Sequence, residues 1–286
     1  MAEAGPEVHH CAHQGHHVQG NLGAAPGSTA GSMTPLARIL AHDADYWTCL
    51  ARAERRAGWT LFHNRDLVPR VDPNHAGDFR APEGSGAAIA REIIDFYRAL
   101  GATPAAYVDL FATPHDLPLH LEQAGFREWP AWANDLMLYV GPDEGHPSPF
   151  ASEIVQTKGQ RDEWASVVQD EADADERMLL RRLYRTEIAD ERVTAFLARV
   201  DGVPASRAEL FSSAGLGRVE AVRTLTAHRG RGLAAAVVRH AVRDSLGRDN
   251  LTYIYAEPGG SAQRLYHRLG FRTVATNLIS FWAWGP

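Results

Sequence analysis

Cysteine is scarce in this sequence, with only Cys11 and Cys49 among 286 residues. Two cysteines cannot build the disulfide framework of a small secreted domain, and they fit a reducing compartment. No apolar run approaches the roughly 20 residues that a membrane-spanning helix needs, and the first residues lack the basic-then-apolar layout of a secretory signal. The sequence therefore predicts a soluble, cytoplasmic protein that does not act at a membrane.

Positive charge is also in deficit, because the formal net charge is −6. A negatively charged chain is a poor general binder of nucleic acid, so no nucleic-acid partner is expected. The pattern GxxxxGK[ST] is absent, and the Gly-x-Gly at 230–232 is too short for a dinucleotide fingerprint. These absences argue against a P-loop and against a Rossmann dinucleotide site.

What is present divides the chain into four segments. Residues 1–32 are rich in glycine, alanine and histidine without hydrophobic periodicity, and they are expected to form a disordered leader. The leader's HHCAHQGHH stretch (9–17) is interpreted as a tail that binds metal only adventitiously, so no metal requirement is expected. Residues 33–140 and 152–286 both mix helix and strand patterns. The segment 141–151, dense in glycine and proline, is expected to link them.

Hydrophobic periodicity and turn residues predict helices and strands in both long segments. In the first segment we expect a helix at 36–57, a strand at 58–64, a helix at 86–100, a strand at 105–111, a short helix at 116–124 and a strand at 135–140. In the second we expect helices at 160–173 and 176–190, two strands within 193–211, a strand at 218–226, a helix at 231–246, a strand at 251–257, a helix at 261–269 and one or two strands within 273–284. Helices that alternate with strands predict an α+β, or mixed α/β, fold class.

Two similar stretches, LHLEQAGF and LYHRLGF, both end in Gly-Phe. A glycine at an expected helix start precedes this pair by nearly the same interval in each half: Gly86 precedes Gly125, and Gly232 precedes Gly270. Both intervals contain helix, strand and helix in that order. A repeated order at a matched interval predicts that one structural unit occurs twice in the chain.

A glycine- and arginine-rich turn provides the strongest chemical signal. In TLTAHRGRGLAAAVVRHAV (224–242), an expected strand leads through a short loop into a helix that starts at 229–234. A helix N-terminus exposes unpaired amides and partial positive charge. Glycines let a phosphate approach those amides, and Arg229 and Arg231 add positive charge. The turn is therefore interpreted as a phosphate site, the alternative being a glycine-rich loop that merely starts a surface helix.

The pattern Arg229-x-x-Gly232-x-Ala234 resembles the (Arg/Gln)-x-x-Gly-x-(Gly/Ala) motif of the GNAT superfamily of acyl-CoA-dependent N-acetyltransferases. The family's second motif, A-x-x-L-Y-x-x-x-G-F, is matched by Ala262, Leu265, Tyr266, Gly270 and Phe271. Together the two motifs cover most of 152–286. The resemblance implies a tandem protein of two GNAT-like domains, each a central, mostly antiparallel sheet flanked by helices, with the catalytic copy at 152–286.

The resemblance also implies how acetyl-CoA, the expected acyl donor, is held. Backbone amides of the turn would bind the pyrophosphate, and the preceding strand would pair with the pantetheine arm as an added strand does. An amide of that strand could also polarise the acetyl carbonyl. Gly259 stands where the family usually has asparagine, which puts the fine positioning of the arm in doubt. The implied cofactor-binding residues are Val222, Arg223, Thr224, Arg229, Gly230, Arg231, Gly232, Leu233 and Ala234.

Tyr266 matches the tyrosine that protonates the departing CoA thiolate in many relatives. A phenol, with a pKa near 10, can donate to a thiolate whose thiol has a pKa of about 8–9 in a nearly balanced transfer. Glu220 is the best-placed general base, with Glu257 and His228 as alternatives. Because neither cysteine lies in the second segment, we expect direct transfer to an amine in a ternary complex, without a covalent enzyme intermediate.

The first copy is expected to be degenerate. Its counterpart of the phosphate turn, DFRAPEGSGAA (78–88), contains Pro82, which has no N–H to donate, and Glu83, whose charge opposes a phosphate. Leu121 stands where the second copy has Tyr266. This segment is therefore expected to pack against the active copy and to shape one wall of the amine pocket.

The expected partners are acetyl-CoA and an amine on a small molecule or peptide, bound by a monomer or homodimer. The acidic run QDEADADE (169–176) could attract a cationic amine or could simply be a solvated helix junction. One alternative function keeps the fold and transfers an aminoacyl group, although the phosphate turn weakens it. The other is a non-catalytic sensor that binds acyl-CoA.

Overall fold

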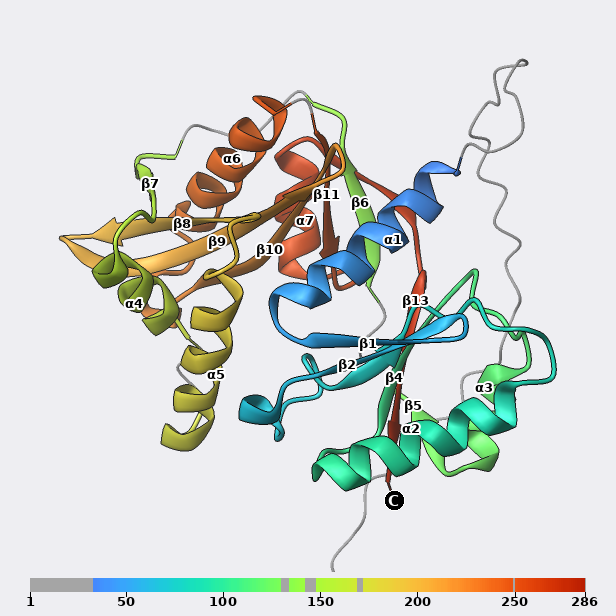
Figure 1. Ribbon diagram of the computed structural model, residues 1–286. Coiled ribbons are helices and arrows are strands. Elements are labelled where there is room, and N and C mark those ends of the chain that lie inside the picture. Colours follow the sequence, from blue (N-terminus) through green and yellow to red (C-terminus); the bar gives the residue numbers. More distant parts are fainter. Residues whose placement is uncertain (1–32, 130–133, 142–147, 169–171, 249, 286) are drawn as a thin grey trace, which may run out of the picture. The chain divides into compact units, whose positions relative to one another are not determined.

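The computed structural model describes residues 33–129, 134–141, 148–168, 172–248 and 250–285 (Figure 1). The predicted leader at 1–32, with its histidine-rich stretch, lies outside these residues, as do most of the expected linker and three residues of the acidic run. Within the described ranges, no helix is both long enough and apolar enough to cross a bilayer.

Two mixed sheets organise the described chain. The first has the strand order β1 (Arg52–Arg56), β2 (Trp59–His63), β3 (His75–Gly77), β4 (Ala105–Asp109), β13 (Ile279–Trp284) and β5 (Phe126–Glu128). The second has the order β12 (Phe271–Ala275), β6 (Asp135–Tyr139), β11 (Leu251–Ala256), β10 (Leu216–Thr224), β9 (Val203–Ser213), β8 (Val193–Val200) and β7 (Ser152–Ile154). The mixed α/β fold class is thus confirmed.

Local sequence explains where several helices begin. The Thr34 side chain accepts from the amide of Ala37 and caps the first helix, and Thr157 and Gln160 form a capping box at the fourth. Gly101, with a φ of 78°, ends the second helix in a left-handed conformation that favours glycine. The helices are α1 (Pro35–Tyr46), α2 (Gly86–Leu100), α3 (Leu117–Gln123), α4 (Lys158–Ser166), α5 (Ala174–Glu187), α6 (Leu233–Leu246) and α7 (Ser261–Arg268).

The expected helix at 36–57 is wrong in its last part. Helix α1 ends at Tyr46, a short 3-10 turn follows, and residues 52–56 form β1, which pairs antiparallel with β2. Gly58, with a φ of 89°, closes this hairpin, and a Cβ there would lie 2.5 Å from the carbonyl oxygen of Arg80. Strand pairing across the hairpin therefore overrides the local helical pattern. The other expected helices and strands are confirmed to within a few residues at their ends, except that the helix expected at 160–173 already ends at Ser166.

The two sheets exchange one strand each. Strand β6 comes from the first segment but lies between β11 and β12 of the second sheet. Strand β13 comes from the end of the second segment but lies between β4 and β5 of the first sheet, where Figure 1 shows it beside β4. Sheet membership therefore does not follow the expected boundary at 141–151, and the division into domains at 33–140 and 152–286 stays a prediction.

The internal repeat is visible in the order of the elements. The run α2, β4, α3, β5, β6 has the same order as α6, β11, α7, β12, β13. In each run the last strand is the one that crosses to the other sheet. Gly125 and Gly270 both have a φ of 95°, and the phenylalanine after each is buried. In both copies the Gly-Phe pair thus follows the corresponding short helix, α3 or α7, and begins the corresponding edge strand, β5 or β12.

Helix α1 connects the first segment to the second sheet. Ile39 and Leu40 of α1 pack in one apolar cluster with Leu136 of β6 and Tyr253 of β11. The opposite face of that sheet is covered by α6, with Val237 among the residues of a separate core. Because α1 lies on the second sheet, its polar residues reach the strand that carries the candidate site.

Candidate active site

The two parallel strands at the centre of the second sheet separate part of the way along. Strands β10 and β11 pair as far as Val219 and Ile254. Beyond this point β10 continues beside β9 to Thr224, and β11 continues beside β6 to Ala256. A register shift marks a bulge at Ala221, which has a φ of 52°. The strands diverge into a wedge, and the β10 side of the wedge can pair with an extended ligand.

The glycine turn follows directly at the end of β10. A 3-10 turn at Thr226–His228 leads into α6, whose N-cap is Gly232 with a φ of 91°. Gly230 has a φ of 75°, and a Cβ at this position would meet nothing within 4 Å. Arg231 is exposed, and its guanidinium lies 5.2 Å from the Phe150 ring. The structure thus brings the predicted residues 222–224 and 229–234 together as one continuous edge and turn.

Tyr266 lies in α7 and is only 5 % exposed, in the core of the second sheet. Burial, and after it the negative charge of Glu220, raises the pKa of the Tyr266 phenol above its usual value. No hydrogen-bond partner for its hydroxyl is found among the described residues. The phenol therefore keeps its proton at neutral pH, but the raised pKa makes its donation to a thiolate less favourable than the nearly balanced transfer expected from the ordinary values.

A cavity of about 350 Å³ lies between the two sheets and reaches the bulge of β10. Aromatic side chains contribute much of its wall, together with four carboxylates and two guanidinium groups. Its charged lining residues are Asp43, Arg70, Asp72, Glu187, Arg218 and Glu220, and its aromatic ones are Tyr46, Trp47, Tyr107, Tyr184, Tyr255 and Phe281. The first segment thus supplies part of the wall of a cavity that also contains Glu220.

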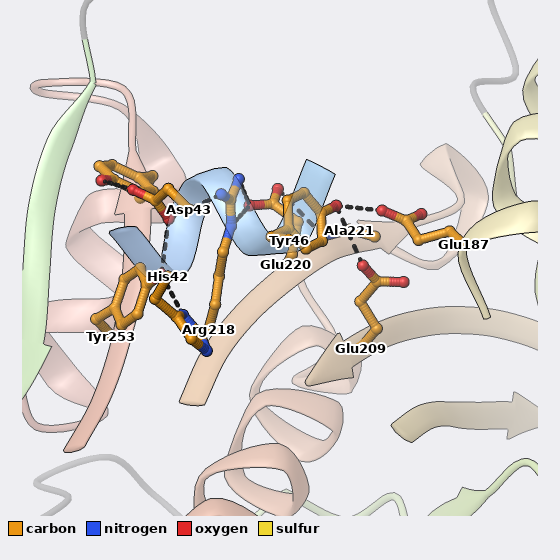
Figure 2. Close-up of polar contacts among 10 residues, drawn as sticks. His42, Asp43, Tyr46, Glu187, Glu209, Arg218, Glu220, Ala221 and Tyr253 are labelled. Atoms are coloured by element: carbon orange, nitrogen blue, oxygen red, sulfur yellow. Dashed lines mark hydrogen bonds and ion pairs between the residues drawn. The ribbon is translucent and has the colours of Figure 1, made fainter. Parts of the chain in front are cut away.

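Arg218 lines this cavity and organises the charge there, and Figure 2 shows its polar contacts. Its Nε and Nη2 donate to Oε2 of Glu220 at 3.0 and 2.8 Å, and its Nη1 donates to Oδ1 of Asp43 at 2.9 Å. Asp43 also accepts from the hydroxyl groups of Tyr253 and Tyr255, both at 2.6 Å. Burial raises the pKa of Asp43, whereas the nearby Arg218 charge lowers it.

Three further residues were not identified from the sequence. The Tyr46 hydroxyl of α1 donates to Oε1 of Glu187, at the end of α5, and contacts Oε1 of Glu209 on β9 at 3.3 Å (Figure 2). Burial raises the pKa of Glu187, and burial together with the Glu187 charge raises that of Glu209 well above its usual value. Glu209 is the one glutamate in the stretch FLARVDGVPASRAELF (196–211), which was the available signal for it, but nothing local links it to Tyr46.

The alternative bases lie elsewhere. Glu257 is exposed just beyond β11, and His228 lies in the turn, with Nδ1 3.3 Å from Nη1 of Arg231. Glu220, by contrast, lines the cavity at the bulge. The geometry therefore favours a carboxylate of the cavity over these two groups for any proton transfer inside it.

The matching place in the first sheet is closed. The Thr113 amide donates to the carbonyl of Phe79 at 3.1 Å, and its carbonyl accepts from the amide of Ala81 at 3.0 Å. These bonds join the chain after β3 to the chain after β4. The Glu83 carboxylate lies against His115, 2.6 Å from Nδ1. An extended ligand therefore has no wedge to enter here comparable to that between β10 and β11.

Comparison with known proteins identifies the class of this fold. The solved GCN5-related N-acetyltransferase from Kribbella flavida matches with a TM-score of 0.64 and 21% identity, over 89% of this chain and 97% of that one. A GCN5-related N-acetyltransferase from Sphaerobacter thermophilus matches at 0.51 and 17%, over 82% and 76%. A tandem GNAT protein from the clavulanic acid biosynthesis pathway matches at 0.51 and 13%, over 74% and 76%. At these identities the likeness concerns the fold.

The family itself is identified from the sequence of the second segment. Residues 160–271 match the model of the Acetyltransferase (GNAT) family. A sequence search of curated proteins finds no match. Residues 160–271 are therefore similar to the acetyltransferase (GNAT) family, and they contain the wedge, the glycine turn and Tyr266.

Proposed function

We propose that this chain is an N-acetyltransferase that moves the acetyl group of acetyl-CoA directly to an amine of a small molecule or peptide. The observation that carries this proposal is the divergence of β10 and β11 beside a glycine-rich helix start whose N-cap residue, Gly232, has no side chain to cap the helix. A strand edge suits an extended amide-containing arm, and a helix N-terminus suits a pyrophosphate. The pantetheine arm and the pyrophosphate of acetyl-CoA thus each have a complementary surface. The strand edge comes directly before the helix start, as the arm adjoins the pyrophosphate in acetyl-CoA.

The residues of the turn and strand have distinct tasks in this proposal. The amides of 229–234 bind the pyrophosphate, and Arg229 and Arg231 add charge at its rim. Residues 222–224 align the pantetheine arm, and an amide near the bulge polarises the thioester carbonyl. Tyr266 protonates the sulfur that leaves. The role of Glu220 as general base stays a prediction.

The acceptor is an amine that enters the cavity as a cation. Four carboxylates against two guanidinium groups in the lining leave an excess of negative charge. Arg70 forms an ion pair with Asp72 at 2.6 Å, so these two charges balance each other. The remaining charged lining residues are three carboxylates, Asp43, Glu187 and Glu220, and one guanidinium group, that of Arg218. Aromatic walls add contact area and cation–π attraction. These features favour a compact, protonated amine with an apolar body.

Calorimetric titration with acetyl-CoA tests the binding part of the proposal, and the repeat offers a matched control. Gly230 and Gly84 have similar φ angles of 75° and 82°, with open space around both Cβ positions. Gly230→Asp places a carboxylate at the proposed pyrophosphate site and should raise the Kd at least about tenfold. Gly84→Asp, in the first copy, should leave it unchanged. Equal affinities in the two variants would contradict the assigned site.

Turnover then separates an enzyme from a sensor. Release of free CoA is followed on a panel of small amines, aminoglycosides, polyamines and peptides with free N-termini. We expect at least one cationic amine to be acetylated. Tight acetyl-CoA binding without turnover on any amine would instead support the non-catalytic sensor.

A further inference from the structure

A pair of buried carboxyl groups forms part of the cavity wall. Glu187 is 3 % exposed and lines the cavity, whereas Glu209 is fully buried. The Tyr46 hydroxyl contacts one oxygen of each (Figure 2). The pair therefore has one member that an acceptor can reach and one that it cannot.

The positive charge of Arg207 favours the ionised form of this pair, but a single charge can offset only one of the two carboxylates. Arg207 of β9 is buried, but its guanidinium lies over the Tyr184 ring at 3.4 Å, and no hydrogen-bond partners are found for its Nε and Nη1 among the described residues. Arg218 of β10 donates to Glu220 and to a carboxylate of α1 rather than to the pair. Two carboxylates that share a buried site cannot both be ionised cheaply, so the pair retains one proton near neutral pH. Full burial assigns that proton to Glu209.

Glu220 is less suited to accept a proton. Its Oε2 receives two hydrogen bonds from Arg218, and its Oε1 receives the amide of Ala221 at 3.3 Å. Both oxygens are thus occupied by donors within the protein. Glu187, by contrast, accepts from Tyr46 at Oε1 and is hydrogen-bonded to Glu209, the other member of the pair.

We propose that Glu187, supported by Glu209 and Tyr46, is the group that takes a proton from the acceptor ammonium in this reaction. The inference rests on the proposed N-acetyltransferase function. One proton moves from the ammonium to a Glu187 oxygen, and the neutral nitrogen then attacks the thioester carbonyl. The N–C bond forms and the C–S bond breaks. Tyr266 gives its proton to the departing sulfur, and a second proton from the nitrogen then restores the Tyr266 hydroxyl. Glu187 releases its own proton to solvent after the products leave.

The pH dependence of kcat/KM tests this assignment. In the unsubstituted protein, activity should fall on the acidic side as Glu187 becomes protonated. Glu187→Gln should lower kcat/KM about 100-fold, abolish that acidic limb and leave the acetyl-CoA Kd unchanged. Glu220→Gln should keep the acidic limb. An acceptor whose nitrogen is already neutral at the assay pH should lose much less rate in Glu187→Gln, because no proton must first be removed.

Other outcomes overturn the proposal in distinguishable ways. Full activity of Glu187→Gln with an unchanged pH profile would exclude Glu187 as the base. An equal loss with neutral and cationic acceptors would assign it a structural role. If Glu187→Gln does not fold, Tyr46→Phe is the second variant, because it removes the hydroxyl that stabilises the Glu187 carboxylate. The acidic limb of the kcat/KM profile should then move to higher pH. An acidic limb that does not move contradicts the proposal. Absence of turnover in the unsubstituted protein would overturn the proposed function itself.

Discussion

At the residue scale, a buried ion pair joins a residue of the first copy to a residue of the second. Arg218 lies on β10, yet one of its hydrogen bonds goes to Asp43 of α1, and its guanidinium lies 4.0 Å from the Tyr46 ring. Loss of one partner of such a buried pair typically costs about 3–5 kcal/mol, because a charge is left uncompensated. The first copy is therefore needed to neutralise the site in the second copy.

Tyr266→Phe isolates the proposed proton donor from the packing of the site. Because the hydroxyl has no partner among the described residues, phenylalanine should fit with a change in unfolding free energy of about 1 kcal/mol or less. We expect kcat to fall about 100-fold while the acetyl-CoA Kd stays the same, as measured by CoA release and calorimetry.

Tyr97→Phe is the matched control for this substitution. The Tyr97 hydroxyl donates to the carbonyl of Phe62 at 2.8 Å, far from the wedge. Its removal should cost about 1 kcal/mol of stability without affecting kcat. Full activity of Tyr266→Phe would show that another group protonates the sulfur.

The site was predictable from the sequence only where it is local. Tyr266 and the turn at 229–234 belong to short motifs that resemble those of the GNAT family, so this resemblance was enough to predict them as site residues. Glu187 and Glu209 are 141 and 163 residues from Tyr46, and only the packing of α1 on the second sheet brings them together. A sequence pattern contains no information on such a contact, so it favoured Glu220, which adjoins the motif.

At the scale of elements, the repeated Gly-Phe stop is a backbone requirement. Gly125 and Gly270 share a φ of 95°, where a Cβ is strained. Gly125→Ala and Gly270→Ala should each lower the free energy of unfolding by about 1–2 kcal/mol in denaturant titrations. In Gly125→Ala the new Cβ would also approach Nε1 of Trp284 to 3.2 Å.

Gly159→Ala provides a control of opposite sign. Gly159 is exposed in the first turn of α4, and its nearest neighbour to an added Cβ, Thr157 Oγ1, is 3.9 Å away. Alanine there should stabilise the protein by up to about 1 kcal/mol. Equal effects at all three glycines would contradict the backbone explanation of the repeat.

Element types were largely predictable, but their partners were not. The strand at 135–140 was recognisable from its apolar residues, whereas its place between β11 and β12 depends on contacts with the other half of the chain. The bulge at Ala221 leaves no mark in the apolar pattern of β10. The feature that opens the wedge was therefore invisible in the sequence, even though the glycine turn beside it was clear.

At the scale of the whole described chain, strand exchange makes each core depend on both segments. Trp282 of β13 belongs to the core that contains Phe126, and Met137 of β6 belongs to the core that contains Phe271. Two domains that fold independently would each contain all their own strands. Here neither segment can complete its sheet alone, so we expect the two sheets to unfold in one cooperative transition.

Hydrogen exchange followed by mass spectrometry can test this dependence with point substitutions. Trp282→Ala should cost about 3–5 kcal/mol and should reduce amide protection first in β4 and β5, although Trp282 lies in the second segment. Met137→Ala should cost about 2–5 kcal/mol and reduce protection first in β11 and β12, although Met137 lies in the first. Leu210→Ala, in a strand that stays with its own segment, should affect only the second sheet at first. The opposite result would be a loss of amide protection in β8 and β9 after Trp282→Ala while β4 stays protected. Each sheet would then be stabilised by its own segment, and the exchanged strands would contribute little to the cores that they enter.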